Sequence, residues 1–132
     1  MKISKYVFVI LLLSGCTTSH HNLNHGPNAL GGGFFDNKVH DGLYSIIAKT
    51  NFAPWSDFKA AHKIFNRRAT ELCQSKNYVS IKMVEKELEH IPRDLPPKYI
   101  ISQVNGYVIC ESSKLTIEEA EKLIQASYEV PL

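Results

Sequence analysis

Three histidines lie close together near the start of the chain, and imidazole is the commonest protein ligand for transition metals. His20, His21 and His25 fall within six residues of one another, in a segment rich in Ser, Asn, His and Gly. The segment has no cysteine and no paired carboxylate, and a selective metal site needs ligands that a scaffold holds in place. We therefore expect this segment to be a polar linker without a cofactor. The alternative is a metal site formed by the three histidines.

Other residues that could act in catalysis are isolated from one another. His40 and Asp41 are adjacent, so on a strand they would point apart. The serines lack the flanking glycines of a nucleophile elbow. Glu85, Glu87 and Glu89 could bind a cation, but a charged strand edge that resists aggregation explains them better. His62 is expected on a helix surface and His90 in a proline-containing loop. We expect no catalytic residues and no enzyme activity.

Residues 1–15 have the three parts of a secretory signal. Lys2 and Lys5 precede an apolar run, Tyr6–Leu13, and the run ends in the small residues Ser14 and Gly15. A run of eight residues is far shorter than the ~20 that a membrane-spanning helix needs. The sequence therefore predicts a segment that is removed on export, although an uncleaved anchor or a plain secreted protein is the alternative.

The end of this leader, Leu13-Ser14-Gly15-Cys16, resembles the bacterial lipobox. The resemblance implies that the Cys16 thiol is diacylglycerated, that cleavage falls before it and that its new amine is acylated. Several acyl chains on one residue would give stable anchoring in membrane lipid. Thr17 follows Cys16 where Asp would imply retention, so the resemblance implies the outer membrane of a Gram-negative cell, facing the periplasm.

The charge of the chain depends on this leader. The formal charge is +2, but removing Lys2 and Lys5 from the 15 basic residues leaves 13, equal to the number of acidic residues. The remaining basic residues are scattered, and Arg67-Arg68 is their only adjacent pair. A neutral chain without a basic patch has no field to attract nucleic acid, so we expect no nucleic-acid partner.

Strands are expected where apolar residues alternate or fill both faces of a segment. Leu43–Thr50 is apolar on both faces, which is typical of a central strand. Tyr78–Glu87 alternates, and Tyr99–Glu111 is expected to carry a bend or bulge at Asn105-Gly106. The prolines between the last two strands predict a loop over Leu88–Lys98, and Phe34 and Phe35 are expected at the edge of the core.

Two helices are expected between and after these strands. The first has Ser56 as its N-cap, an apolar stripe through Phe58, Phe65 and Leu72, and Asn77 as its C-terminal cap. The second begins at a capping box, Thr116-Ile-Glu-Glu119, and runs to about Ser127.

This order of elements predicts an α+β domain with a small three-stranded mixed sheet (β-α-β-β-α) and a crossover helix packed on one face. The first two strands, joined through the helix, should be parallel if they are adjacent, and the last two should form an antiparallel hairpin. The predicted organisation is a signal peptide over residues 1–15, a lipidated Cys16 with a flexible tether over 16–33, and a single domain over 34–132.

The predicted topology brings Cys73 and Cys110 to the same end of the domain. Cys73 lies in the last turn of the crossover helix and Cys110 near the end of the third strand. The two residues lack the Cys-x-x-Cys spacing of redox enzymes. An exported chain meets an oxidising compartment, so a Cys73–Cys110 disulfide is expected, with two buried free thiols as the alternative.

A wider resemblance covers about Gly31–Lys82. The runs "GGGFFDNKVHDGLYSIIAKTNF" and "FNRRATELCQSKNYVSI" are similar to those of a family of short bacterial lipoproteins of uncharacterised function. The resemblance carries no catalytic residues to this chain. We therefore expect a non-enzymatic binding module of the cell envelope that meets a protein partner through Phe52 and Trp55. The alternative is a lipoprotein that binds a small ligand or a metal.

Overall fold

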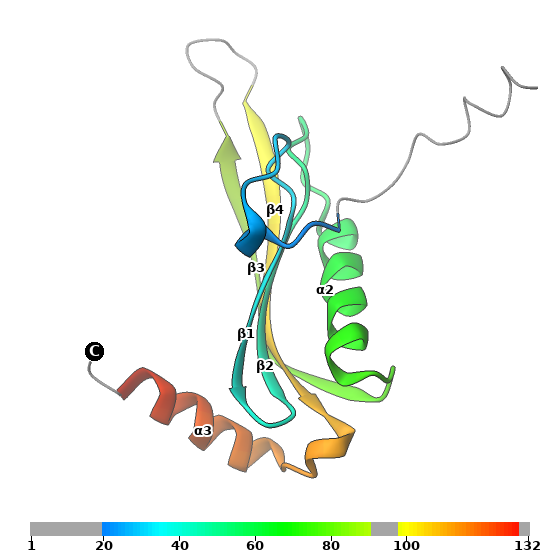
Figure 1. Ribbon diagram of the computed structural model, residues 1–132. Coiled ribbons are helices and arrows are strands. Elements are labelled where there is room, and N and C mark those ends of the chain that lie inside the picture. The colour runs from blue at the N-terminus through cyan, green and yellow to red at the C-terminus, as the bar shows by residue number, and fades with distance from the viewer. Residues whose placement is uncertain (1–19, 91–97, 130–132) are drawn as a thin grey trace, which may run out of the picture.

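The computed structural model describes residues 20–90 and 98–129. Its elements, in chain order, are η1 (Leu23–His25), β1 (Gly33–His40), β2 (Leu43–Lys49), α2 (Phe58–Cys73), β3 (Tyr78–His90), β4 (Tyr99–Cys110), η2 (Glu111–Ser113) and α3 (Ile117–Glu129) (Figure 1). The signal peptide and Cys16 lie outside the described residues, as does most of the loop expected over Leu88–Lys98. No helix in the described ranges is long and apolar enough to cross a membrane.

The four strands form one antiparallel sheet in the order β1-β2-β4-β3. The α+β class is as expected, but the three-stranded mixed sheet is wrong. β2 and β3 do run in the same direction through the crossover helix, yet β4 lies between them and pairs antiparallel with both. The predicted parallel pairing therefore does not form.

The strand that the prediction lacked is β1. It pairs with β2 through a turn at Asp41 and Gly42, where Gly42 has φ of +73°. Phe34 on β1 is buried, whereas Asn37 and Lys38 are exposed because β1 is an edge strand. These polar residues interrupt the alternation by which a strand is normally detected.

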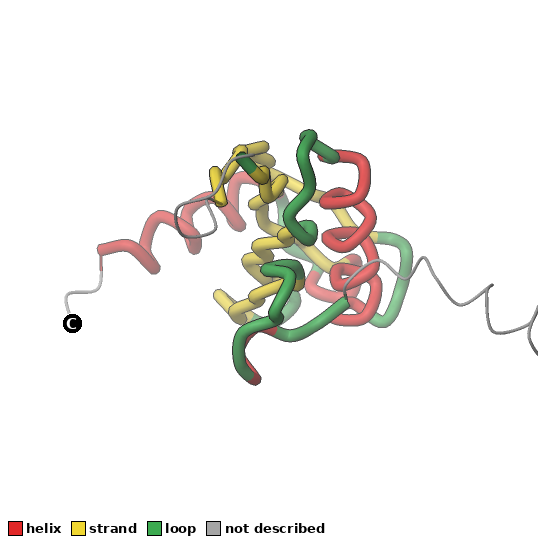
Figure 2. Tube along the Cα trace, turned by 90° about the horizontal axis from the view of Figure 1, so that it is seen from above, coloured by secondary structure: helices red, strands yellow, loops and turns green. Residues whose placement is uncertain are grey.

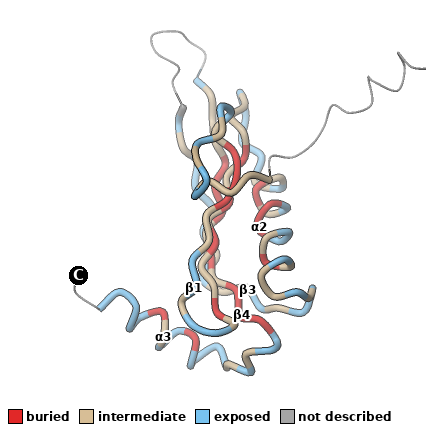
Figure 3. Tube along the Cα trace, viewed as in Figure 1, coloured by how far each residue is buried: buried red, intermediate tan, exposed pale blue. Residues whose placement is uncertain are grey.

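Each helix covers a different face of the sheet (Figures 1 and 2). α2 packs along one face and α3 packs against one end of the other. The buried residues line the surfaces where these layers meet (Figure 3). The first cluster, under α2, contains Phe34, Ile46, Ala48, Ala61, Ile64, Phe65, Ala69, Val104 and Val108. The second, under α3, contains Leu43, Ile109, Ala120 and Ile124.

The helix ends differ in part from the expected caps. Asp57, not Ser56, caps α2, because its carboxylate accepts a hydrogen bond from the Ala60 amide at 2.9 Å. The α2 C-cap is Gln74 in the left-handed region with φ of +53°, not Asn77. The capping box of α3 is confirmed. The Glu119 amide donates to the Thr116 hydroxyl at 3.2 Å, and the Thr116 amide donates to the Glu119 carboxylate at 2.8 Å.

The bulge expected in β4 lies on its neighbour β3. Ile81 pairs with Tyr107 and Val84 with Asn105, so Lys82 and Met83 together face Gly106. Lys82 adopts φ of +52° to form this bulge. The Met83 side chain packs against the first cluster, in the space left by the missing side chain of Gly106. The glycine thus accommodates the bulge without forming it.

We expect Gly106→Ala to lower the free energy of unfolding by about 1–3 kcal/mol, as overpacking does. The added methyl would lie 3.3 Å from Phe65 Cζ and closer still to Met83 Sδ. Urea denaturation followed by circular dichroism measures the change. In a Met83→Ala background the methyl has room, so the cost there should be smaller. An equal cost in both backgrounds would contradict this packing.

The disulfide between Cys73 and Cys110 is present, with a Cα–Cα distance of 5.2 Å. It forms because α2 ends beside the start of β3, and Tyr78 at that start pairs with Cys110 at the end of β4. The predicted meeting of the two cysteines at one end of the domain is confirmed, even though one of the strand pairings behind it is not.

Candidate functional site

Residues 20–32, which the sequence analysis assigned to the tether, lie against the domain. The Phe34 amide donates to the His21 carbonyl at 2.8 Å, and Asn22 forms an isolated parallel bridge with Phe34. Further along, the Phe52 amide donates to the Leu30 carbonyl at 3.0 Å. These bonds fasten the segment to β1 and to the connection after β2. His20, the first of the described residues, is also in contact with the domain.

His20 is held by a charged cluster between β1 and α2, which we call the latch (His20, Phe34, Asp36, Arg68 and Glu71). His20 Nε2 lies 2.8 Å from Glu71 Oε1, and its ring packs on Phe34 with centroids 4.7 Å apart. Arg68 donates to Asp36 at 2.7 Å and to Glu71 at 3.1 Å. Its guanidinium carbon lies 4.6 Å from the Phe34 ring centroid, within cation–π range.

The latch lowers the pKa of Glu71 below its ordinary value. Partial burial alone would raise that pKa, but hydrogen bonds from His20 and Arg68 favour the carboxylate and outweigh it. The pKa of Arg68 is raised, because hydrogen bonds to Asp36 and Glu71 outweigh the opposing effect of its burial. His20 Nδ1 is buried and has no hydrogen-bond partner among the described residues, so the contact with Glu71 is made through the other ring nitrogen.

We expect Glu71→Gln to loosen residues 20–34 at neutral pH by up to about 1 kcal/mol, since partly exposed ion pairs contribute little. Because folding depresses the pKa of Glu71, its contribution is present above the unfolded pKa and is lost as pH falls through the folded value. Hydrogen exchange at the Phe34 amide should therefore be faster in the variant at neutral pH and equal to wild type in acid. Glu118→Gln, at an exposed position of α3, is the control. An unchanged rate at neutral pH would contradict the latch.

The other two histidines are placed separately. His21 Nε2 lies 2.9 Å from the Gly26 carbonyl oxygen, and His25 is exposed in η1. Within residues 20–90 and 98–129 no three His, Cys, Asp or Glu side chains are close enough to hold a metal ion. Each of the three carboxylates of β3 has a different partner. Glu85 pairs with His62 at 2.7 Å and Glu89 with Lys98 at 3.4 Å. Glu87 accepts a hydrogen bond from the Ser56 hydroxyl.

The two aromatic residues singled out from the sequence differ in exposure. Phe52 is half-buried, with its ring centroid 5.2 Å from that of Tyr99. Trp55 is 65% exposed. Both lie in the connection over residues 50–57 between β2 and α2, which we call the Trp55 loop.

The Trp55 loop is fastened to β4 at both ends. Ala53 and Ile100 exchange backbone hydrogen bonds of 3.0 and 2.7 Å. The Ser102 carbonyl oxygen accepts a hydrogen bond of 3.0 Å from the Thr50 amide, and the Ser102 hydroxyl accepts one of 2.7 Å from the Asp57 amide. Ser102 is fully buried, so these bonds are shielded from water. The loop therefore presents Trp55 from a rigid base.

A hollow of about 210 Å³ adjoins Trp55. It is lined by Thr50, Asn51, Ala53, Trp55, Asp57, Ala60 and Ile64. Its volume is below the range of roughly 300–1,000 Å³ typical of small-molecule sites. A hollow of this size, beside an exposed indole, is suited to a side chain of a protein partner.

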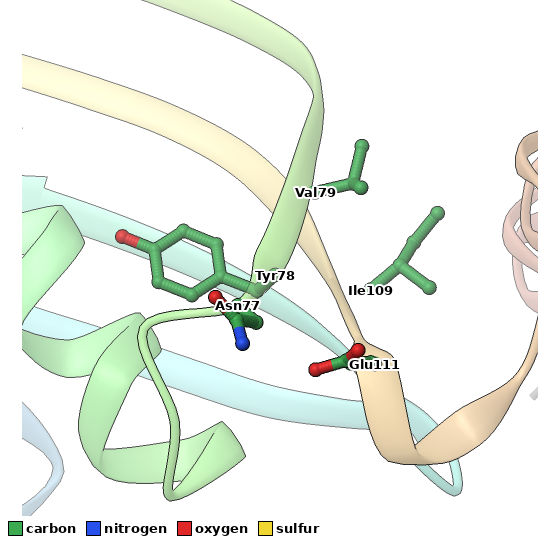
Figure 4. A pocket seen from close by; sticks show the side chains of 5 residues that line it. All are labelled: Asn77, Tyr78, Val79, Ile109 and Glu111. Carbon is green, nitrogen blue, oxygen red and sulfur yellow. The ribbon is translucent and has the colours of Figure 1, made fainter.

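A second hollow, of about 290 Å³, lies at the disulfide end of the domain, where Val79 and Ile109 project side by side near the Glu111 carboxylate (Figure 4). Tyr78 points to the other face of the sheet, where its hydroxyl donates to Asn66 at 3.1 Å. The hollow offers apolar contact and one charge, without a nucleophile and base in reach of each other among the residues that line it.

The largest of these hollows, about 440 Å³, lies on the sheet face opposite α2. Its polar side chains come from Ser45, Lys82, Asn105, Tyr107 and Tyr128. Burial and a hydrogen bond with Tyr128 raise the pKa of Tyr107 to about 12, so this phenol stays neutral at physiological pH. Its volume falls within the small-molecule range.

Comparison with known proteins gives no relative. No protein-family model matches the chain, and neither a curated protein nor a solved structure does. The function must therefore be argued from the residues themselves.

The latch was not predicted from the sequence, although one signal for it was present. Arg68 lies within the apolar stripe of α2, between Phe65 and Ala69, which are both buried. A cation on the core side of a helix needs a carboxylate partner nearby. The partner is Asp36, which could not be predicted because β1, the strand that carries it, was not expected.

Proposed function

We propose that this chain is a lipoprotein of the bacterial cell envelope, anchored through Cys16 in the outer membrane, that binds a protein partner without enzymatic activity. The leader supports the anchor, since it combines a short apolar run with Leu13-Ser14-Gly15-Cys16. The Cys73–Cys110 disulfide supports export, because disulfides persist mainly in oxidising compartments. The anchored chain belongs, on this proposal, with the short lipoproteins that it resembles.

The observation that carries the binding role is the exposure of Trp55. Tryptophan is enriched among the few residues that dominate protein interfaces. Trp55 is 65% exposed beside a hollow sized for a side chain. Its loop is held by backbone bonds to β4, so a partner would not have to order it on binding.

Crosslinking in living cells tests this role. With a photoreactive amino acid at position 55, we expect a discrete adduct with one envelope protein. Position 128 is the matched control, because Tyr128 is an aromatic residue 71% exposed on α3. No adduct from position 55, or the same adducts from both positions, would contradict a partner site at the Trp55 loop.

The anchor has its own test. We expect the mature chain to begin at Cys16, to carry the mass of attached acyl chains and to sediment with membranes. Cys16→Ser should move the chain to the soluble periplasmic fraction. A mature chain that begins elsewhere, or that has no added mass, would contradict the anchor and leave the Trp55 test unaffected.

The second candidate function is the binding of a small ligand, favoured by the 440 Å³ hollow with its Lys82, Asn105 and Tyr107 side chains. A ligand there should raise the melting temperature of wild type and of Trp55→Ala equally. A metal role for His20, His21 and His25 is distinguished by titration of the chain with and without residues 17–25.

A further inference from the structure

The outer surface of α2 carries three basic residues in one row. Lys59, Lys63 and Arg67 are spaced by four residues, which places them on one side of the helix, and all three are exposed. Each precedes a buried residue of α2 by two positions, a rotation of about 200° about the axis. The row therefore faces directly away from the sheet. We call it the basic face.

The basic face has little negative charge to balance it. Lys59 and Lys63 have no carboxylate within ion-pair distance among the described residues, and Arg67 has only Glu71, at 3.5 Å. Glu71 is also shared with Arg68 and His20 in the latch. Over its 16 residues α2 holds four cations, and Glu71 is its one carboxylate.

The other helix has the opposite charge. α3 carries Glu118, Glu119, Glu121 and Glu129 against a single cation, Lys122. It packs on the opposite face of the sheet from α2 (Figure 2). The two helices thus carry opposite net charges, with four cations against one carboxylate on α2 and one cation against four carboxylates on α3.

The latch determines which side is nearest the lipid anchor. His20 is bonded to Glu71 on the flank of α2, and Cys16 precedes it by four residues. Four residues span at most about 14 Å when fully extended. A lipidated Cys16 lies at the membrane surface, so the flank of α2 is held within that distance of the headgroups. The flexible tether over residues 16–33 that the sequence predicts would have imposed no such orientation.

We infer that the basic face of α2 rests on the anionic phospholipid surface in which the chain is anchored. This inference depends on the proposed anchor at Cys16. Lys59, Lys63 and Arg67 would lie among the lipid phosphates, and α3 would be turned away from them. The anchor keeps the local concentration of lipid high, so a weak attraction from three cations is sufficient. The Trp55 loop would then be held at a fixed height above the membrane.

Labelling of lysine amines on vesicles tests the orientation. The chain from Cys16 onward has one free thiol, because Cys73 and Cys110 are bonded, so Cys16 can be coupled to a maleimide phospholipid. Vesicles of phosphatidylcholine are compared with vesicles that also contain phosphatidylglycerol. A water-soluble amine reagent and peptide mass spectrometry then give the labelling rate of each lysine.

In the anionic vesicles we expect Lys59 and Lys63 to be labelled about fivefold more slowly, the effect of one favourable lipid contact per cation. Lys82 and Lys122, on the α3 side, are the internal controls and should keep their rates. High salt should remove the protection. Lys59→Glu should reduce the protection of Lys63, whereas Lys82→Glu should leave it unchanged.

Equal labelling in both kinds of vesicle, or protection of Lys82 and Lys122 instead, would overturn the inference. So would crosslinking of position 63 in cells to a protein, because the face would then be occupied by that protein. Chemical coupling makes the vesicle result independent of lipidation in the cell. Protection of the basic face without acyl mass on Cys16 in cells would contradict the anchor alone, and acyl mass without protection would contradict this inference alone.

Discussion

Phe65→Ala is expected to lower the free energy of unfolding by about 3–5 kcal/mol, a large part of the 5–15 kcal/mol typical of a folded domain. Phe65 is 0% exposed and belongs to the cluster between α2 and the sheet. Its ring tip reaches β4 where Gly106 has no side chain. Truncation would leave a cavity between α2 and the inner strand β4, and urea denaturation measures the loss.

Phe35→Ala is the matched control for Phe65→Ala. Phe35 is the neighbouring phenylalanine of Phe34 on β1 and is only half-buried, with Lys49 5.5 Å from its ring centroid. Its loss should be clearly smaller, because less apolar area returns to water. Equal losses for the two variants would show that the α2 cluster is not the main core of the domain.

Removing the disulfide is expected to cost about 4 kcal/mol by the chain-entropy model for a loop of this length. Cys73 and Cys110 are separated by 37 residues, a segment that contains all of β3 and most of β4. The melting temperature of Cys73→Ser/Cys110→Ser should fall by roughly 15 °C in a domain of this size. Calorimetry of the variant and of wild type measures the difference.

Reduction of wild type provides the control for the disulfide variant. Wild type in reductant should melt close to the variant, and reductant should not shift the variant further. Alkylation without reductant should modify Cys16 alone in unlipidated chain. Modification of all three cysteines under those conditions would show that the bond is absent in solution.

Local features of the fold were predictable wherever a short pattern determines them. The capping box at Thr116 and Glu119, the helix over α2 and the three strands from Leu43 onward each follow from a pattern that a few neighbouring residues complete. The disulfide also followed, because it depends on the hairpin of β3 and β4 and on the direction of α2.

Features that depend on distant residues were not predictable in the same way. The rule for crossover connections gives a direction for β3 relative to β2, but it does not say which strand lies between them. The docking of residues 20–32 depends on Glu71, 51 residues after His20, so composition alone indicated a tether. The bulge was expected at Asn105-Gly106 because glycine often marks an irregular strand. The bulge lies instead on the neighbouring strand β3, and Gly106 leaves room for its Met83 side chain.

The order of the strands also affects how the chain folds. β4 is the last strand in the sequence and occupies an inner position, between β2 and β3. A chain that emerges from its N-terminus therefore forms only the β1–β2 hairpin and α2 at first, and an isolated hairpin is marginally stable. The sheet can be completed only when residues 99–110 are available. Cys110, the final residue of β4, can meet Cys73 only then. The sheet is thus incomplete until β4 has emerged, and the same strand both completes the sheet and brings Cys110 to Cys73 for the disulfide.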